Sequence, residues 1–252
     1  MKVPPAGADD RCLLSKILLF LGRILKSLPK VNLINDDLFV AIHDVLLQIL
    51  QEQVHGEGGR MKYVQNGDTT SMGLATEIIG FLAAIFRRLD AAQLSKLVSY
   101  SKCVDTIADF AYFVFSSDNT LTRSHFLRLN CLSCILSFAS LSSLLSVANA
   151  DTICNLIRLL VQITGSFQKT FANFVDGNSF TYKDGCAYKW TVLCLRNLSR
   201  TVIAFESNQN TWIWGDQWLY ANDIEWLLTL LNDDEKMIQK FGLGILSNLI
   251  LM

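Results

Sequence analysis

Residues 227–252 read LLTLLNDDEKMIQKFGLGILSNLILM, and this stretch decides the fold that the sequence predicts. An apolar run is followed by the acidic turn NDDE at 232–235 and then by a second apolar run. Neither run alternates between apolar and polar residues, and apolar residues recur at intervals of three and four, which is the spacing of a helix. The stretch therefore predicts two helices joined by a short turn.

The same pattern of long apolar-periodic stretches and short polar breaks recurs along the whole chain. Only three prolines occur, all before residue 30, so nothing interrupts the later helices. We expect about ten or eleven helices, including those at 10–27, 37–50, 72–89, 91–98, 104–115, 121–145, 152–164, 187–206, 223–231 and 235–252. Two loop insertions are predicted, a glycine-rich one at 53–72 and a tryptophan-rich one at 207–221.

Each of these helices is apolar on more than one side. A helix that buries two faces belongs in a stack, where a neighbour lies on either side of it. We therefore predict an all-α, right-handed α-solenoid that forms one domain over 1–252. Because the last eight residues are apolar and lack a polar outer face, we expect either a piece of a longer solenoid or a partner that covers this end.

The charge balance argues against partners that bind mainly through the overall electrostatic field of the protein. Lys and Arg number 22 and Asp and Glu number 23, which gives a net charge of −1. Such a chain has no global attraction for nucleic acid or for anionic lipid. The partners predicted are other proteins, with no nucleic acid, no membrane and no small-molecule substrate.

Cysteines and hydropathy indicate a cytoplasmic protein. Seven cysteines, an odd number, lie mostly among leucines and isoleucines, which is typical of reduced buried thiols. The start of the chain lacks a signal-peptide pattern. The segment 129–150 has no charge, but its six serines favour a packed helix over a membrane span.

Two segments resemble the third helix of armadillo repeats. These are 190–199, WTVLCLRNLS, and 242–249, GLGILSNL, the second of which follows the apolar helix and acidic turn at 227–234. The ending is also similar to that of rotatin-like proteins, armadillo-type scaffolds of centrioles and basal bodies. The resemblance implies a protein-binding scaffold module in the cytoplasm, at the centrosome, centriole or basal body of the cilium.

In armadillo families the third helices line a groove in which asparagines hold the backbone of an extended peptide. Carried over to this chain, Asn197 and Asn248 are the groove asparagines, with Trp190, Arg196 and Arg200 beside them. A simpler interpretation is that each asparagine ties neighbouring helices together by hydrogen bonds to backbone groups, as buried amides commonly do. The repeated array of Trp and Asn that peptide-binding importins carry is absent, so a nuclear transport adaptor is the second hypothesis.

The densest aromatic cluster contains Trp212, Trp214 and Trp218. Tryptophan is enriched in interface hot spots, so this connector is a candidate docking segment. The alternative is that it fills a gap between repeats, because exposed tryptophans are costly.

No pattern in the sequence supports an enzyme, a metal or a cofactor. Cys131 and Cys134 have the spacing of a metal or redox pair, with His125 six residues earlier, but a zinc site needs four ligands and no second pair is present. The other histidines, His43 and His55, accompany no recognised nucleophile motif. We expect these cysteines to be packing residues.

Overall fold

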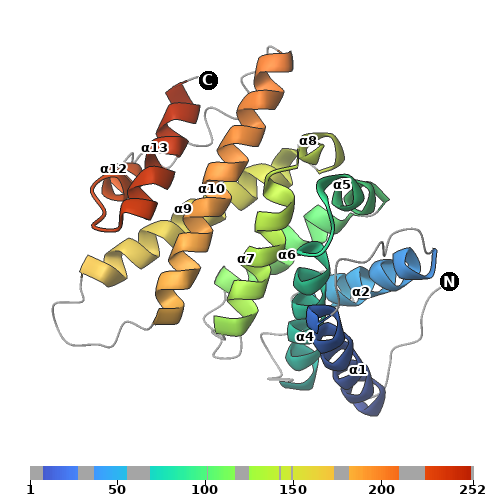
Figure 1. Ribbon diagram of the computed structural model, residues 1–252. Helices are drawn as coiled ribbons and strands as arrows, with labels where there is room; N and C mark the ends of the chain where they lie inside the picture. The colour runs from blue at the N-terminus through green and yellow to red at the C-terminus, as the bar shows by residue number, and fades with distance from the viewer. Residues whose placement is uncertain are drawn as a thin grey trace. The chain divides into compact units, whose positions relative to one another are not determined.

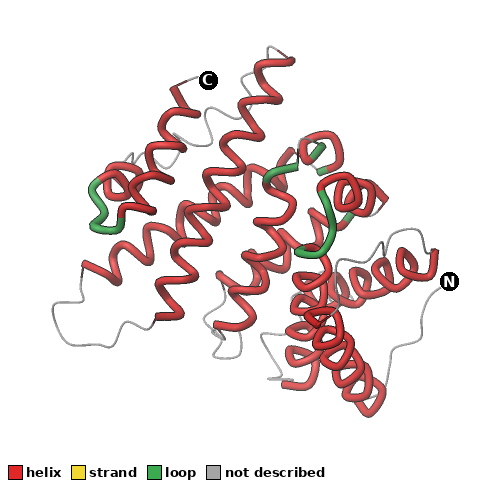
Figure 2. Tube along the Cα trace, viewed as in Figure 1, coloured by secondary structure: helices red, strands yellow, loops and turns green. Residues whose placement is uncertain are grey.

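The computed structural model describes residues 8–27, 37–55, 69–100, 102–116, 125–141, 143–148, 150–172, 182–209 and 225–250. Within these ranges every regular element is a helix and no residue lies in a strand, which confirms the predicted all-α class (Figures 1 and 2). The helices are α1 (Ala8–Ser27), α2 (Asp37–His55), α4 (Thr69–Phe86), α5 (Ala91–Tyr100), α6 (Cys103–Ser116), α7 (His125–Ala139), α8 (Leu144–Val147), α9 (Ala150–Ala172), α10 (Tyr182–Gln209), α12 (Glu225–Leu231) and α13 (Lys236–Ile250).

The chain divides into two compact units, Met1–Cys134 and Ile135–Met252, and the division falls within α7. Helix covers both ends of the predicted loop 53–72, since α2 continues to His55 and α4 begins at Thr69. Helix α10 likewise continues to Gln209, inside the predicted loop 207–221. The remainder of both loops lies outside the described residues.

The core of the first unit is built around α4. This helix is apolar on nearly all sides, and its residues from Ile78 to Phe86 are buried with the single exception of half-buried Gly80. Helices α1 and α2 both pack against α4, and α2 also contacts α6. Helix α5 starts with a capping box, in which the amide of Gln93 donates to the carboxylate of Asp90 at 2.8 Å.

The second unit contains two helical hairpins. The first helix of one hairpin packs against the first helix of the other, and the second helix packs against the second. Helices α9 and α10 form the first hairpin, and α12 and α13 form the second (Figure 1). Helix α9 contacts α12, where the side-chain amide of Gln168 donates to the carbonyl oxygen of Trp226 at 2.9 Å. Helix α10 also contacts α13.

The contacts between α10 and α13 show that these two helices are parallel. Tyr188 contacts Asp233 near the start of both, and Ser199 contacts Asn248 further along. The residue number therefore rises in the same direction on both helices.

One predicted helix is wrong in its extent. The prediction of a helix over 121–145 fails because α7 ends at Ala139, and only the short α8 follows. The serines at 140 and 143 favour turns, since serine hydroxyls compete for backbone hydrogen bonds. The carbonyl oxygen of Ala139, left open at the helix end, accepts a hydrogen bond of 2.8 Å from the Thr201 hydroxyl.

Candidate partner-binding surface

One stripe of α10 stays outside the core of the second unit. Its members recur every three or four residues, so they lie along one side of the helix. They are Cys186, Lys189, Trp190, Leu193, Arg196, Asn197 and Arg200, all half-buried or exposed. The structure thus brings all four predicted α10 residues, Trp190, Arg196, Asn197 and Arg200, onto the same stripe.

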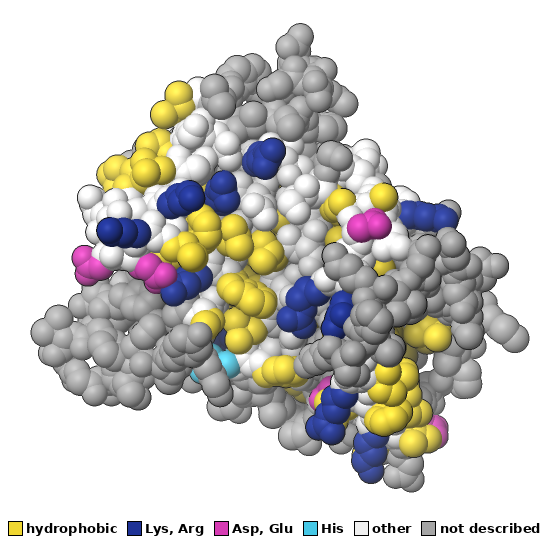
Figure 3. All heavy atoms as spheres, viewed as in Figure 1, with side chains coloured by type: hydrophobic (Ala, Val, Ile, Leu, Met, Phe, Trp, Pro, Cys, Tyr) yellow, Lys and Arg dark blue, Asp and Glu magenta, His cyan; other side chains and the backbone are white. Residues whose placement is uncertain are grey.

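Helix α13 carries a second exposed stripe beside the first. It consists of Lys236, Met237, Lys240, Leu243, Ser247 and Ile250. We call the two stripes together the α10–α13 face. Over these two helices, Lys and Arg side chains lie among hydrophobic side chains (Figure 3).

Arg196 joins the two stripes. Its guanidinium carbon lies 5.7 Å from the centre of the Phe241 ring, a cation–π distance. A Cβ added at Gly244 would lie 2.8 Å from Arg196 Nε, so the missing side chain of this glycine makes room for the arginine. Arg196 is therefore held across α13 rather than extended into solvent.

Asn248 is half-buried and ties α13 to α10. Its side-chain amide donates to the Ser199 hydroxyl oxygen at 2.8 Å. This contact supports the simpler interpretation of Asn248 as a link between helices, although the acceptor is a side chain. Asn197 lies on the α10 stripe, where its side chain is half-buried.

The acidic turn at 232–235 lies at the end of this face that is remote from Asn248, and its side chains bond to α10. One carboxylate oxygen of Asp233 accepts from the Glu235 amide at 2.8 Å, and the other accepts from the Tyr188 hydroxyl at 3.2 Å. Lys189 forms an ion pair of 2.6 Å with Glu235. Burial, together with the nearby carboxylates, raises the pKa of Tyr188, so its hydroxyl keeps the proton that it donates.

The prediction from sequence missed several members of the face. Leu193 lies one turn after Trp190 on the α10 stripe, and helical spacing alone would have found it. Lys240 and Leu243 of α13 were also missed, although they are three residues apart and so share one side of the helix. The three tryptophans of the connector, Trp212, Trp214 and Trp218, lie outside the described residues.

The cysteine pair is buried in the first unit. Cys131 and Cys134 have no exposed surface, and the Cys134 thiol donates to the carbonyl oxygen of Ile79 at 3.8 Å. Burial raises the pKa of both thiols, which keeps them protonated and poor as metal ligands. Among the described residues, no group of three or more His, Cys, Asp or Glu side chains is arranged to hold a metal ion.

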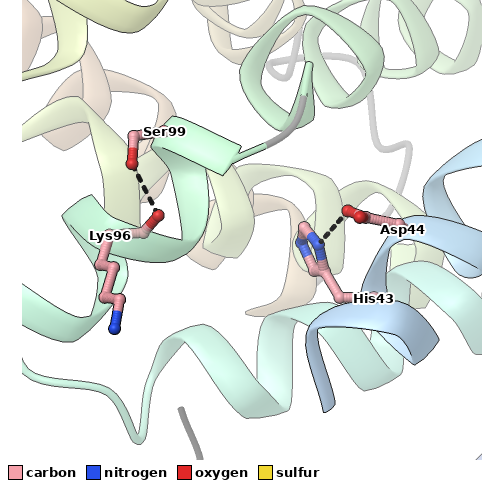
Figure 4. Close-up of polar contacts among 4 residues, drawn as sticks. All are labelled: His43, Asp44, Lys96 and Ser99. Carbon is pink, nitrogen blue, oxygen red and sulfur yellow. Dashed lines mark hydrogen bonds and ion pairs between the residues drawn. The ribbon is translucent and has the colours of Figure 1, made fainter. Parts of the chain in front are cut away.

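His43 on α2 is also buried, and it lies beside Phe86 (ring centroids 6.3 Å apart). Its Nδ1 is 3.4 Å from a carboxylate oxygen of Asp44, and its Nε2 is buried without a partner (Figure 4). The other contact in Figure 4 is local to α5, where the Ser99 hydroxyl donates to the carbonyl oxygen of Lys96. Burial lowers the pKa of His43, so its ring is neutral and forms part of the core.

In the ranges that the structure describes, no helix is long and apolar enough to cross a membrane. No family model matches the chain, and no curated protein or solved structure is significantly similar to it.

Proposed function

We propose that the chain is an armadillo-like scaffold module that binds other proteins through the α10–α13 face. The stacking of two helical hairpins, with α10 parallel to α13, supports a repeat array of this type. By its resemblance to rotatin-like proteins, the module acts in a cytoplasmic assembly at the centrosome, centriole or basal body.

The observation that carries the proposal is the composition of the α10 stripe. The solvent side of a helix usually carries charged and polar residues. Here Trp190 and Leu193 lie on that side, next to Asn197, and all three are half-buried. Tryptophan and arginine are the residues most enriched in interface hot spots, and this stripe carries both types.

The charge of the face indicates the kind of partner. Arg200 and Lys240 are exposed, and Arg196, one turn before Arg200, lies against Phe241 of α13. Opposite charges across an interface raise the association rate and select the partner. An acidic peptide segment is therefore the partner that this face fits best.

The test uses the variant Arg200→Glu/Lys240→Glu. Both side chains are exposed, so the reversal of charge changes the face without touching the core. The matched control is Lys96→Glu/Lys102→Glu, which reverses two exposed charges in the first unit. Proteins captured from cell extract by the wild type are identified, purified and titrated against all three forms.

We expect at least one purified partner to bind the wild type and the control equally and the face variant about tenfold more weakly or worse. The proposal fails if every captured partner binds the folded face variant as tightly as the wild type. It also fails if no captured protein binds the purified chain directly.

A further inference from the structure

Helix α1 of the first unit is apolar on two opposite sides. One side packs on α4 through buried Leu18 and through Gly22, where an added Cβ would lie 4.0 Å from Phe81. The opposite side carries Leu13, Ile17 and Phe20, with exposed fractions of 60%, 45% and 63%. Single exposed apolar residues are ordinary, but three in line on one helix mark a surface that a partner covers.

The spacing of these residues is that of a coiled-coil seam. Leu13, Ile17, Phe20 and Ile24 follow one another at steps of four, three and four residues, which corresponds to positions d, a, d and a of the heptad. We call these four residues the α1 seam. A seam of this kind accepts the apolar side chains of one further helix.

Basic residues flank the α1 seam on one side. Lys16 and Arg23 are both exposed, and in the same heptad register both occupy position g. Figure 3 shows a hydrophobic patch over α1 with Lys and Arg side chains beside it. Residues at e and g set partner choice through ion pairs between helices.

From the seam and its flank we infer that α1 docks one amphipathic helix of another protein, with Glu or Asp opposite Lys16 and Arg23. The apolar residues of that helix fill the α1 seam, and its acidic residues pair with the two bases. Because α1 is already ordered by its contact with α4, docking does not require α1 to fold first.

A second copy of this chain is a poor occupant of the seam. An antiparallel pair would bring Lys16 of one copy towards Arg23 of the other, and like charges repel. A parallel pair would place each base against position e, which is Leu14 or Leu21 in this register. The segment 11–35 contains five basic residues and no acid, so within α1 a second copy offers carboxylates only from Asp9 and Asp10 in the first turn.

A membrane surface is also disfavoured. Helices that lie in the membrane interface have a broad apolar face and a strongly charged polar face. The side of α1 opposite to the seam is occupied by α4, and Leu19 and Leu21 beside the seam are also exposed (39% each), so α1 has no continuous, strongly charged face. The docking of α1 is independent of the α10–α13 face, since it uses other residues in the other unit.

The test titrates fluorescent synthetic peptides into the full chain and follows their anisotropy. Both peptides carry Ile at a and Leu at d, and they differ only at e and g, where one has Glu and the other has Lys. The variants are Lys16→Glu/Arg23→Glu, which reverses the flank, and Ile17→Asp, which places a charge in the seam. The control variant is Lys96→Glu/Lys102→Glu, and vesicles of phosphatidylcholine with phosphatidylserine form a third ligand.

We expect the wild type and the control to prefer the Glu peptide by about tenfold or more, because the ion pairs select it. The flank variant should prefer the Lys peptide, and Ile17→Asp should bind neither. Equal binding of the two peptides, or no binding of either, overturns the inference. The inference is also overturned if the wild type shows no preference for the Glu peptide but binds the anionic vesicles, and the flank variant loses that binding. This result would assign the seam to lipid.

Discussion

The side-chain amide of Asn248 on α13 donates a hydrogen bond to the hydroxyl oxygen of Ser199 on α10, over 2.8 Å. The Ser199 hydroxyl in turn donates to the carbonyl oxygen of Arg196, also over 2.8 Å. Ser199 is fully buried, so its hydroxyl finds both its hydrogen-bond donor and its hydrogen-bond acceptor inside the protein. This pair sets the register of two parallel helices at the end of the α10–α13 face that is remote from the acidic turn.

The double-mutant cycle of Asn248→Ala and Ser199→Ala measures this link. Each single substitution should lower the free energy of unfolding by about 1 kcal/mol, and the coupling between them should be about 0.5–1.5 kcal/mol. All five tryptophans lie in Ile135–Met252, so urea unfolding followed by tryptophan fluorescence reports this unit. Strictly additive losses would show that the two side chains do not interact.

The glycines of α13 and α4 should respond to alanine in opposite directions. An added Cβ at Gly242 would lie 3.0 Å from Leu230 Cβ and 3.4 Å from the Leu230 backbone, so α12 and α13 must separate. We expect Gly242→Ala to cost about 1–3 kcal/mol in the second unit. Gly73 has nothing within 4 Å, and Gly73→Ala should stabilise the first unit by up to about 1 kcal/mol, because alanine favours the helix.

Thermal unfolding by circular dichroism, with tryptophan fluorescence alongside, separates the two glycine effects. If Gly242→Ala raises the melting temperature as Gly73→Ala does, the prediction that α12 packs too closely on α13 to admit a Cβ at residue 242 is wrong.

The first unit should lose stability in mild acid because of His43. Burial depresses the pKa of His43 in the folded chain, so its contribution to stability is complete above the unfolded value of about 6.5. Below that value the unfolded chain binds a proton that the folded chain resists, and stability falls towards the lower folded pKa. Urea unfolding by circular dichroism from pH 8 to pH 5 should show this loss.

His43→Leu removes the titrating ring and the buried Nε2 atom that has no partner. The variant should therefore show a smaller loss of stability between pH 7 and pH 5 than the wild type. An identical pH dependence in the two proteins would mean that His43 is not buried in the neutral form.

Thiol reactivity should follow burial. Cys12 is exposed, whereas Cys103, Cys131, Cys134 and Cys194 have no exposed surface, and burial raises the pKa of these four thiols. With iodoacetamide in native buffer, peptide mass spectrometry should find Cys12 modified first and the four buried thiols modified only after unfolding. Rapid native modification of Cys131 or Cys134 would contradict the packing of α7 against α4.

The sequence was sufficient to predict the helical class because hydrophobic periodicity is a local signal. It also placed Trp190 and Asn197 on one side of one helix, since two turns separate them. The end of α7 at Ala139 was not predictable in this way, because apolar residues continue through the serine-rich segment that follows. There the break depends on turn hydrogen bonds and on Thr201, which comes 62 residues later.

The contacts between α10 and α13 could not be predicted from local sequence patterns either. Periodicity assigns Arg196 to a helix face but does not reveal that the face meets Gly244 and Phe241. The two glycines at 242 and 244, within an otherwise apolar helix, are the one signal in the sequence for a close approach there. The second apolar side of α1 was visible in its composition, but its exposure is known only from the structure.

The role of the α10–α13 face is tested by hydrogen–deuterium exchange of the full chain, with and without a purified partner that was captured from cell extract and binds the chain directly. We expect added protection on α10 around 189–200 and on α13 around 236–250. This protection should be lost in Arg200→Glu/Lys240→Glu and kept in Lys96→Glu/Lys102→Glu. Protection that leaves both helices unchanged while a partner is bound would contradict it.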